Sequence, residues 1–225
     1  MLGVDGCKKG WVGVALGEGR VSAYFAARIG DLVSRAEEGG ALEVVAVDIP
    51  IGLPDSGRRQ ADVLARREVG PRWQSVFMTP TRAALEAADH TSAIAINRRL
   101  AGEGVSRQAF ALKKKLLEVD LWVHRARQHV VEVHPELCFA RLAGAPLPVR
   151  KTTWAGVEHR RALLADAGIV IAGDIGLAGV MAGVDDVFDA AVAAWTAQRV
   201  AVGQARSVPC PPQVFGDGLS CAIWA

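Results

Sequence analysis

Four aspartates have the residue type and the placement needed for a carboxylate metal site. Asp5 closes a short strand-like segment at the start of the chain, and Asp48 lies near the end of an apolar run over residues 44–49. Asp186 and Asp189 are three residues apart in a long helical pattern, so their side chains share one face of that helix. If the two strands are neighbours in one sheet, the four carboxylates meet at one edge of it.

Carboxylates gathered in this way attract divalent cations. Like charges raise one another's pKa, and a bound cation relieves the repulsion. Oxygen ligands favour Mg²⁺ or Mn²⁺, and two such ions about 4 Å apart can hold the attacking and leaving oxygens of a phosphoryl displacement, with a metal-bound water as nucleophile. The four aspartates are therefore candidate metal ligands and candidate catalytic residues for phosphodiester hydrolysis.

Each aspartate also has a structural interpretation. Asp5 precedes a glycine, as a turn residue does, and Asp186 suits the N-terminus of a helix because of the helix dipole. Asp48 is harder to explain in this way, because an acid in a strand of Val, Ala and Ile is destabilising unless it is paired or binds a ligand. The site interpretation depends on all four residues meeting in one fold.

The first elements predict a mixed sheet. Residues 2–5, 11–16 and 21–26 alternate like strands, and their short connections favour antiparallel neighbours. Residues 29–38 have apolar side chains at helical spacing, and residues 43–49 form the nearly continuous apolar run of a strand buried on both faces. Three antiparallel strands are thus followed by a helix and a buried strand.

The rest of the chain alternates helices with fewer strands. Residues 58–128 form a basic helical block, with helices expected over 58–68, 81–101 and 108–128. After it we expect a strand over 129–134, further helices, a long helix over 185–203, a Pro-rich tail over 206–212 and a last strand over 219–224. This is the element order of an α/β, RNase H-like fold. We expect a single domain over residues 1–225, with a helical insertion at approximately 58–128 before the fifth strand.

Composition limits the class of protein. The 225 residues are 51% hydrophobic and 22% charged, which is enough to form a core, and the net charge of +2 neither requires nor excludes nucleic acid. We expect no membrane span and no signal peptide, and free thiols at the four cysteines, so a cytoplasmic location. A homodimer is compatible with the sequence.

Four segments resemble a known family. GVDGCKKGWVGV at 3–14, VDIPIGLP at 47–54, EVHPELCF at 132–139 and DDVFDAAVAAWTA at 185–197 are similar to the predicted RNase H-like nuclease family, a bacterial and archaeal domain of unknown function (number 429). The resemblance implies an RNase H-like fold and a metal-dependent nuclease. The family's implied carboxylates fall on Asp5, Asp48, Asp186 and Asp189.

One glutamate lies in the expected fifth strand, and another follows it. Glu136 follows His134 and Pro135, where it would lie near the aspartates as a further catalytic group or metal ligand, or would only stabilise a helix N-terminus. Glu132 alternates with valines, so we expect it to point away from the core.

Basic residues gather in the helical block. Guanidinium and ammonium groups bind phosphates, so we take five residues of this block and Lys151, further along the chain, as candidate substrate-binding residues: Arg58, Arg66, Arg72, Arg82, Lys115 and Lys151. A solvated helix face explains any one of them equally well. If the partner is nucleic acid, we expect recognition of its backbone rather than its bases.

Three hypotheses for function follow. The first is an Mg²⁺- or Mn²⁺-dependent nuclease, a hydrolase acting on DNA or RNA. The second is a non-catalytic module on the same fold that binds nucleic acid or protein, and the third is a phosphotransfer enzyme acting on nucleotides. The sequence contains no P-loop, dinucleotide-binding, zinc-protease or serine-hydrolase motif.

Overall fold

The computed structural model describes residues 1–17 and 19–225, and these form one seven-stranded mixed sheet in the order β3-β2-β1-β4-β5-β7-β6. The strands are β1 (Leu2–Cys7), β2 (Gly10–Gly17), β3 (Arg20–Ala26), β4 (Val44–Val47), β5 (His129–Val133), β6 (Ser207–Val214) and β7 (Ser220–Trp224). The first three strands pair antiparallel. The strands β1, β4, β5 and β7 run parallel, and β6 lies antiparallel to β7 at the edge.

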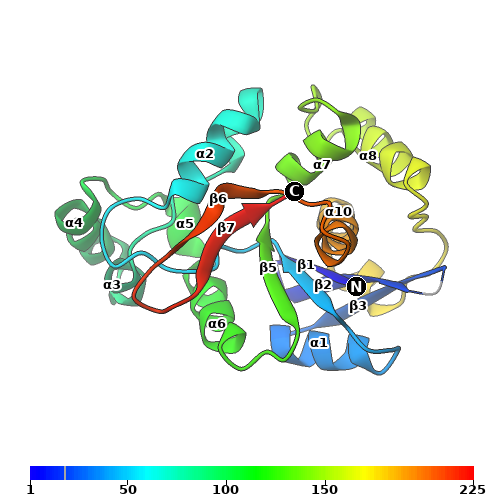
Figure 1. Cartoon of the computed structure of the whole chain (residues 1–225), viewed down its shortest axis with the longest axis horizontal. Coiled ribbons are helices and arrows are strands. Elements are labelled where there is room, and N and C mark those ends of the chain that lie inside the picture. The colour runs from blue at the N-terminus through cyan, green and yellow to red at the C-terminus, as the bar shows by residue number, and fades with distance from the viewer. Residues whose placement is uncertain (18) are drawn as a thin grey trace.

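Helices cover both faces of this sheet. They are α1 (Ile29–Glu37), α2 (Gln60–Glu68), α3 (Arg82–Glu86), α4 (His90–Ala101), α5 (Arg107–Ala111), α6 (Lys113–Val123), α7 (Pro135–Ala143), α8 (Trp154–Asp166), α9 (Leu177–Met181) and α10 (Val184–Ala201), with a 3-10 helix, η1 (Gly70–Ser75), after α2. Figure 1 shows α1 and α6 on one side of the sheet and α2, α7 and α10 on the other. A separate hydrophobic core fills each side.

The central strand determines how closely α10 approaches the sheet. Leu2 and Val4 are fully buried and pack into the core beneath α1 and α6. Gly3 faces the other way, and a Cβ atom built on it would lie 2.1 Å from the backbone of Ala190 and Ala194. Only glycine lets the backbone of α10 come this close to β1.

The mixed sheet flanked by helices confirms the predicted α/β class, but the boundaries predicted for several helices were wrong. The helix expected over 81–101 is broken into α3 and α4, because the Asp89 carboxylate accepts a hydrogen bond from the Ser92 N–H at 2.8 Å and starts a new helix. The helix expected over 108–128 is likewise divided between α5 and α6 at Leu112.

The Pro-rich segment is the other correction. Residues 206–212 were expected to be an irregular tail, but Ser207–Val214 is a strand of the sheet. Its prolines are tolerated because it is an edge strand with an irregular register between Val208 and Gln213. Within the described ranges, no helix is both long and apolar enough to span a membrane.

Candidate metal centre

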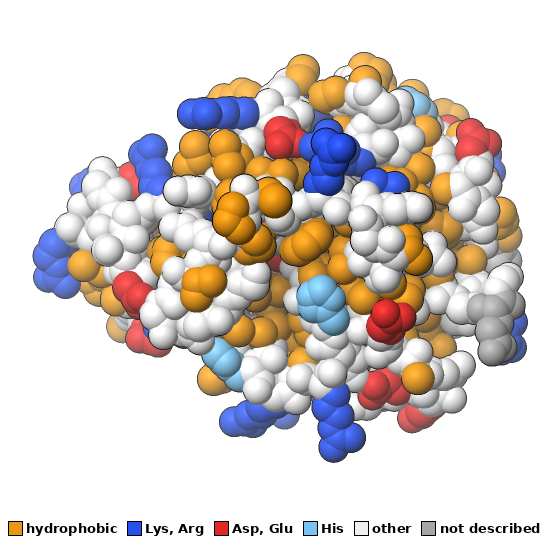
Figure 2. Space-filling view, in the orientation of Figure 1, with side chains coloured by type: hydrophobic (Ala, Val, Ile, Leu, Met, Phe, Trp, Pro, Cys, Tyr) orange, Lys and Arg blue, Asp and Glu red, His pale blue; other side chains and the backbone are white. Residues whose placement is uncertain are grey.

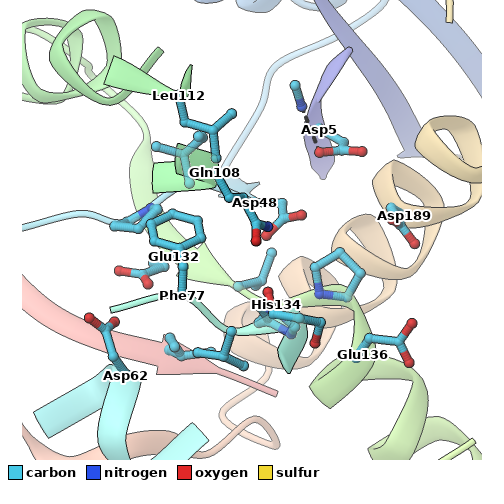
Figure 3. Close-up of a pocket in the computed structure, with 18 of the residues that line it drawn as sticks. Asp5, Asp48, Asp62, Phe77, Gln108, Leu112, Glu132, His134, Glu136 and Asp189 are labelled. Atoms are coloured by element: carbon cyan, nitrogen blue, oxygen red, sulfur yellow. Dashed lines mark hydrogen bonds between the residues drawn. The ribbon is translucent and has the colours of Figure 1, made fainter. Parts of the chain in front are cut away.

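Three of the four predicted aspartates converge at one point of the fold. Asp5 extends from β1, Asp48 follows β4 directly, and Asp189 lies in α10. One carboxylate oxygen from each lies within 4.8 Å of the other two. Figure 3 shows the three side chains, from three separate elements, around one cavity.

Backbone geometry explains this convergence. The parallel pairing of β1 with β4 places Val4 opposite Val47, and the Asp48 N–H donates to the Val4 carbonyl oxygen at 2.9 Å. Asp5 lies two residues after Gly3, so its side chain is on the same face of the sheet as α10. The close approach of α10 that Gly3 permits therefore brings Asp189 to the carboxylates of the two strands.

The electrostatics of the three acids are unfavourable without a counter-charge. Burial, and then repulsion from Asp48 and Asp189, raises the pKa of Asp5 well above its usual range. Burial and the neighbouring Asp189 raise the pKa of Asp48 to about 8, and burial raises the pKa of Asp189 to about 6. Such a cluster is stabilised by protons or by a cation.

Lys151 contacts the cluster as a cation. Its Nζ lies 2.6 Å from Asp189 Oδ2 and 3.4 Å from Asp185 Oδ2. Burial would lower the pKa of Lys151, but the contact with Asp189 outweighs it and raises the pKa above its usual value. Lys151 was predicted to bind substrate, and the structure brings it into the carboxylate cluster itself.

Asp186 lies at the cavity but outside the cluster of three. Its Oδ2 accepts a hydrogen bond from the Gly183 N–H at 2.9 Å, which caps the start of α10. Asp189 is one turn further along the helix and points into the cluster. Of the two helical aspartates, therefore, Asp186 has a capping role in the structure and Asp189 faces the other acids.

Glu136 lines the same cavity, at the start of α7. Its Oε1 accepts a hydrogen bond from the Arg160 guanidinium at 2.7 Å, and the Arg160 side chain is only 1% exposed. Its Oε2 is buried and has no hydrogen-bond partner in the described part of the chain. Glu136 is thus held in place by one oxygen and presents the other without a partner.

The cavity has a volume of about 270 Å³ and continues beyond Asp48. Figure 3 shows Phe77, Glu132 and Asp62 on the side of Asp48 away from Asp189. His134 also lines the cavity, and burial lowers its pKa to about 4, so its imidazole is neutral at pH 7. The three aspartates therefore lie at one end of the cavity, and Phe77, Glu132 and Asp62 line the other.

A buried ionic network behind the cavity was not predicted. Arg59 is fully buried, and its guanidinium donates to Asp62 Oδ1 at 3.0 Å, to Thr79 Oγ1 at 2.8 Å and to Glu132. The Ile51 N–H also donates to Glu132, at 2.8 Å. Glu132 is 4% exposed, so the expectation that it points away from the core was wrong.

Glu132 can be buried because the Arg59 guanidinium is available as its partner. Burial raises the pKa of Glu132 to about 7, and the Arg59 guanidinium opposes that rise. A glutamate buried beside Val131 and Val133 requires a buried cation. The alternation of the strand did not reveal this cation, because Arg59 is 73 residues away in the chain.

Most of the predicted substrate-binding residues have partners within the protein. Arg58 pairs with Glu103, and Arg82 with Asp120 and Asp217. Backbone carbonyl oxygens accept from the others: Arg66 contacts Val76, Arg72 contacts Leu147 and Pro148, and Lys115 contacts Gly10. In Figure 2, Lys and Arg side chains lie over this face in separate small groups rather than in one stripe.

Comparison with known proteins identifies one family. Residues 3–214 match the model of the family described as "Protein of unknown function (DUF429)". No curated protein and no solved structure matches the chain significantly.

Proposed function

The chain belongs to the DUF429 family, which is described only as of unknown function, and we therefore propose its activity from the site itself: a metal-dependent nuclease that hydrolyses phosphodiester bonds of nucleic acid. The observation that carries this proposal is the meeting of Asp5, Asp48 and Asp189, whose carboxylate oxygens lie within 4.8 Å of one another beside a cavity. In this proposal the helical acid Asp186 and the cavity acid Glu136 support the three ligands.

The strand order supports an RNase H-like interpretation of the fold. Three antiparallel strands in the order β3-β2-β1 continue into the parallel strands β4 and β5, which is the arrangement that the sequence predicted. The helices between β4 and β5, at approximately 58–128, would then be an insertion into a single domain over 1–225. Fold alone does not assign function, so the proposal depends on the acids.

The donor set fits a hard divalent cation. All three candidate ligands are carboxylates, and oxygen-only sites favour Mg²⁺ or Mn²⁺ over zinc or copper. When bound, such an ion lowers the pKa of water and polarises a phosphoryl oxygen. The raised pKa values of the three acids indicate that the cluster is electrostatically incomplete without added positive charge.

Three residues of the protein would contact the substrate in the cavity. The Lys151 ammonium has three donors and contacts two acids, Asp189 and Asp185, so one donor is left for a phosphate oxygen. The buried Oε2 of Glu136 is an unused acceptor at the same cavity. The neutral His134 contributes an uncharged wall rather than a further cation.

A cleavage assay tests the proposal. Purified protein with Mg²⁺ or Mn²⁺ should cleave at least one of single-stranded DNA, duplex DNA, RNA or a branched junction. Asp48→Asn should abolish cleavage, because it removes one of the three converging carboxylates. Asp166→Asn is the matched control, since Asp166 is exposed at the end of α8 and should leave activity unchanged.

The comparison between the wild type and Asp48→Asn decides whether the nuclease assignment holds. Cleavage by the wild type that Asp48→Asn retains at the same rate would contradict the assignment. Lack of both Mn²⁺ binding and cleavage in the wild type would also contradict it, and retained binding of nucleic acid would then favour a non-catalytic module.

A further inference from the structure

Lys151 brings a cation of the protein itself into contact with the aspartates. Four aspartates predicted two metal ions, but one of the converging carboxylates, Asp189, is already bonded to an ammonium group at 2.6 Å. The same ammonium lies 3.4 Å from Asp185. The cluster therefore contains a cation that belongs to the protein.

The backbone around Lys151 is fixed. The Thr153 N–H and hydroxyl both donate to the Arg150 carbonyl oxygen, at 3.2 and 2.9 Å. Arg160 Nη1 donates to the Val149 carbonyl oxygen at 3.3 Å. A Cβ atom on Gly156 would lie 1.9 Å from the Arg150 carbonyl oxygen, so the start of α8 packs directly on this loop.

These contacts give Lys151 a defined position. The Val149 carbonyl oxygen, two residues before it, accepts from Arg160 of α8, and Arg160 is in turn paired with Glu136 of the cavity wall. The side chain of Lys151 is 35% exposed. It is supplied to the cluster by a loop that the fold holds in place.

The other acids near the cluster are already occupied. Asp186 caps the start of α10, Glu136 pairs with Arg160, and Asp185 contacts Lys151. The three converging carboxylates and the Lys151 ammonium together have a formal charge of −2, which one divalent ion neutralises. Asp185 and Asp186 are partly exposed and lie outside this group of three.

On this basis we propose that the site holds one divalent cation per chain, and that Lys151 supplies the positive charge that a second ion would provide. This inference rests on the proposed function, because it assumes that Asp5, Asp48 and Asp189 bind metal. In the reaction, the Lys151 ammonium would stabilise the negative charge on the phosphate.

Mn²⁺ titration tests the inference without an activity assay. Isothermal titration calorimetry should give one Mn²⁺ per wild-type chain and two per chain of Lys151→Met. The first ion should also bind the variant at least about tenfold more tightly, because a nearby like charge has been removed. Lys114→Met is the control, since Lys114 is exposed on α6 and its loss changes the net charge equally.

Electron paramagnetic resonance of bound Mn²⁺ gives a second readout. Isolated-ion spectra are expected for the wild type and for Lys114→Met, and spin-coupled spectra for Lys151→Met. Two ions in the wild type, or one ion in both the wild type and Lys151→Met, would overturn the inference and leave the nuclease proposal standing. Absence of binding in the wild type would overturn both, and the wild-type result decides even if the variant does not fold.

Discussion

Replacing Asp48 by Asn should stabilise the metal-free protein, because the Asp48 carboxylate lies buried among other acids. Its pKa is raised from 3.8 to about 8 by burial and by the neighbouring Asp189. At low pH the folded and unfolded chains both hold this proton. Between about pH 4 and pH 8 the unfolded chain is ionised while the folded chain keeps the proton, so the free energy of unfolding falls as pH rises.

The size of the effect can be bounded. A rise of this size in the pKa of one group corresponds to ~6 kcal/mol at full ionisation. The repulsion is shared with Asp5 and Asp189, and Lys151 offsets part of it, so we assign about a third of that value, ~2 kcal/mol, to Asp48. For a domain of this size, ~2 kcal/mol raises the Tm by about 4–8 °C.

The assay is thermal and urea unfolding of the wild type and Asp48→Asn in a chelating buffer, at pH 5 and pH 8. Asn cannot ionise, so the variant should be more stable by ~2 kcal/mol at pH 8 and by much less at pH 5. Added Mn²⁺ should raise the Tm of the wild type only, since a ligand stabilises the state that binds it.

Two results would refute this reasoning. If Asp48→Asn were less stable than the wild type at pH 8 without metal, Asp48 would be a satisfied structural group. If its gain were the same at pH 5 and pH 8, the effect would not come from ionisation. Asp166→Asn, which changes an exposed carboxylate, should be neutral at both pH values.

Two further substitutions test the framework around the site. Arg59→Met should lower the free energy of unfolding by ~3–5 kcal/mol, because it leaves Glu132 and Asp62 buried without their cation. Arg58→Met is the control and should change the free energy of unfolding by less than about 1 kcal/mol, since Arg58 is in a surface pair. Urea unfolding measures both variants, and equal losses of stability would contradict the buried network. Gly3→Ala should destabilise the protein by ~3 kcal/mol and weaken Mn²⁺ binding, because its Cβ would displace α10 and Asp189. Gly17→Ala is the control: a Cβ there has open space, so stability and Mn²⁺ binding should not change. Unchanged Mn²⁺ binding by calorimetry in Gly3→Ala would show that α10 is not positioned by this contact.

Much of the fold could be predicted because local patterns determine it. The alternating strands at the start of the chain, the apolar run before Asp48 and the long helix that carries Asp189 each appear in the structure near their expected places. Periodicity reports which side chains an element buries, and that is a property of adjacent residues. The edge strand at 207–214 was missed because its prolines suggest a loop unless the position at the sheet edge is known.

The sequence by itself determined which residues could form the site: the four aspartates Asp5, Asp48, Asp186 and Asp189, of which Asp48 follows an apolar run where an unpaired charge is unfavourable. Only the tertiary structure decided which acids meet and what lies between them. It placed Asp186 at a helix cap, buried Glu132 against Arg59, and brought Lys151 from a separate loop into the cluster. These pairings depend on contacts between residues far apart in the chain, such as the approach of α10 over Gly3, and the local periodicity of a sequence contains no information about them.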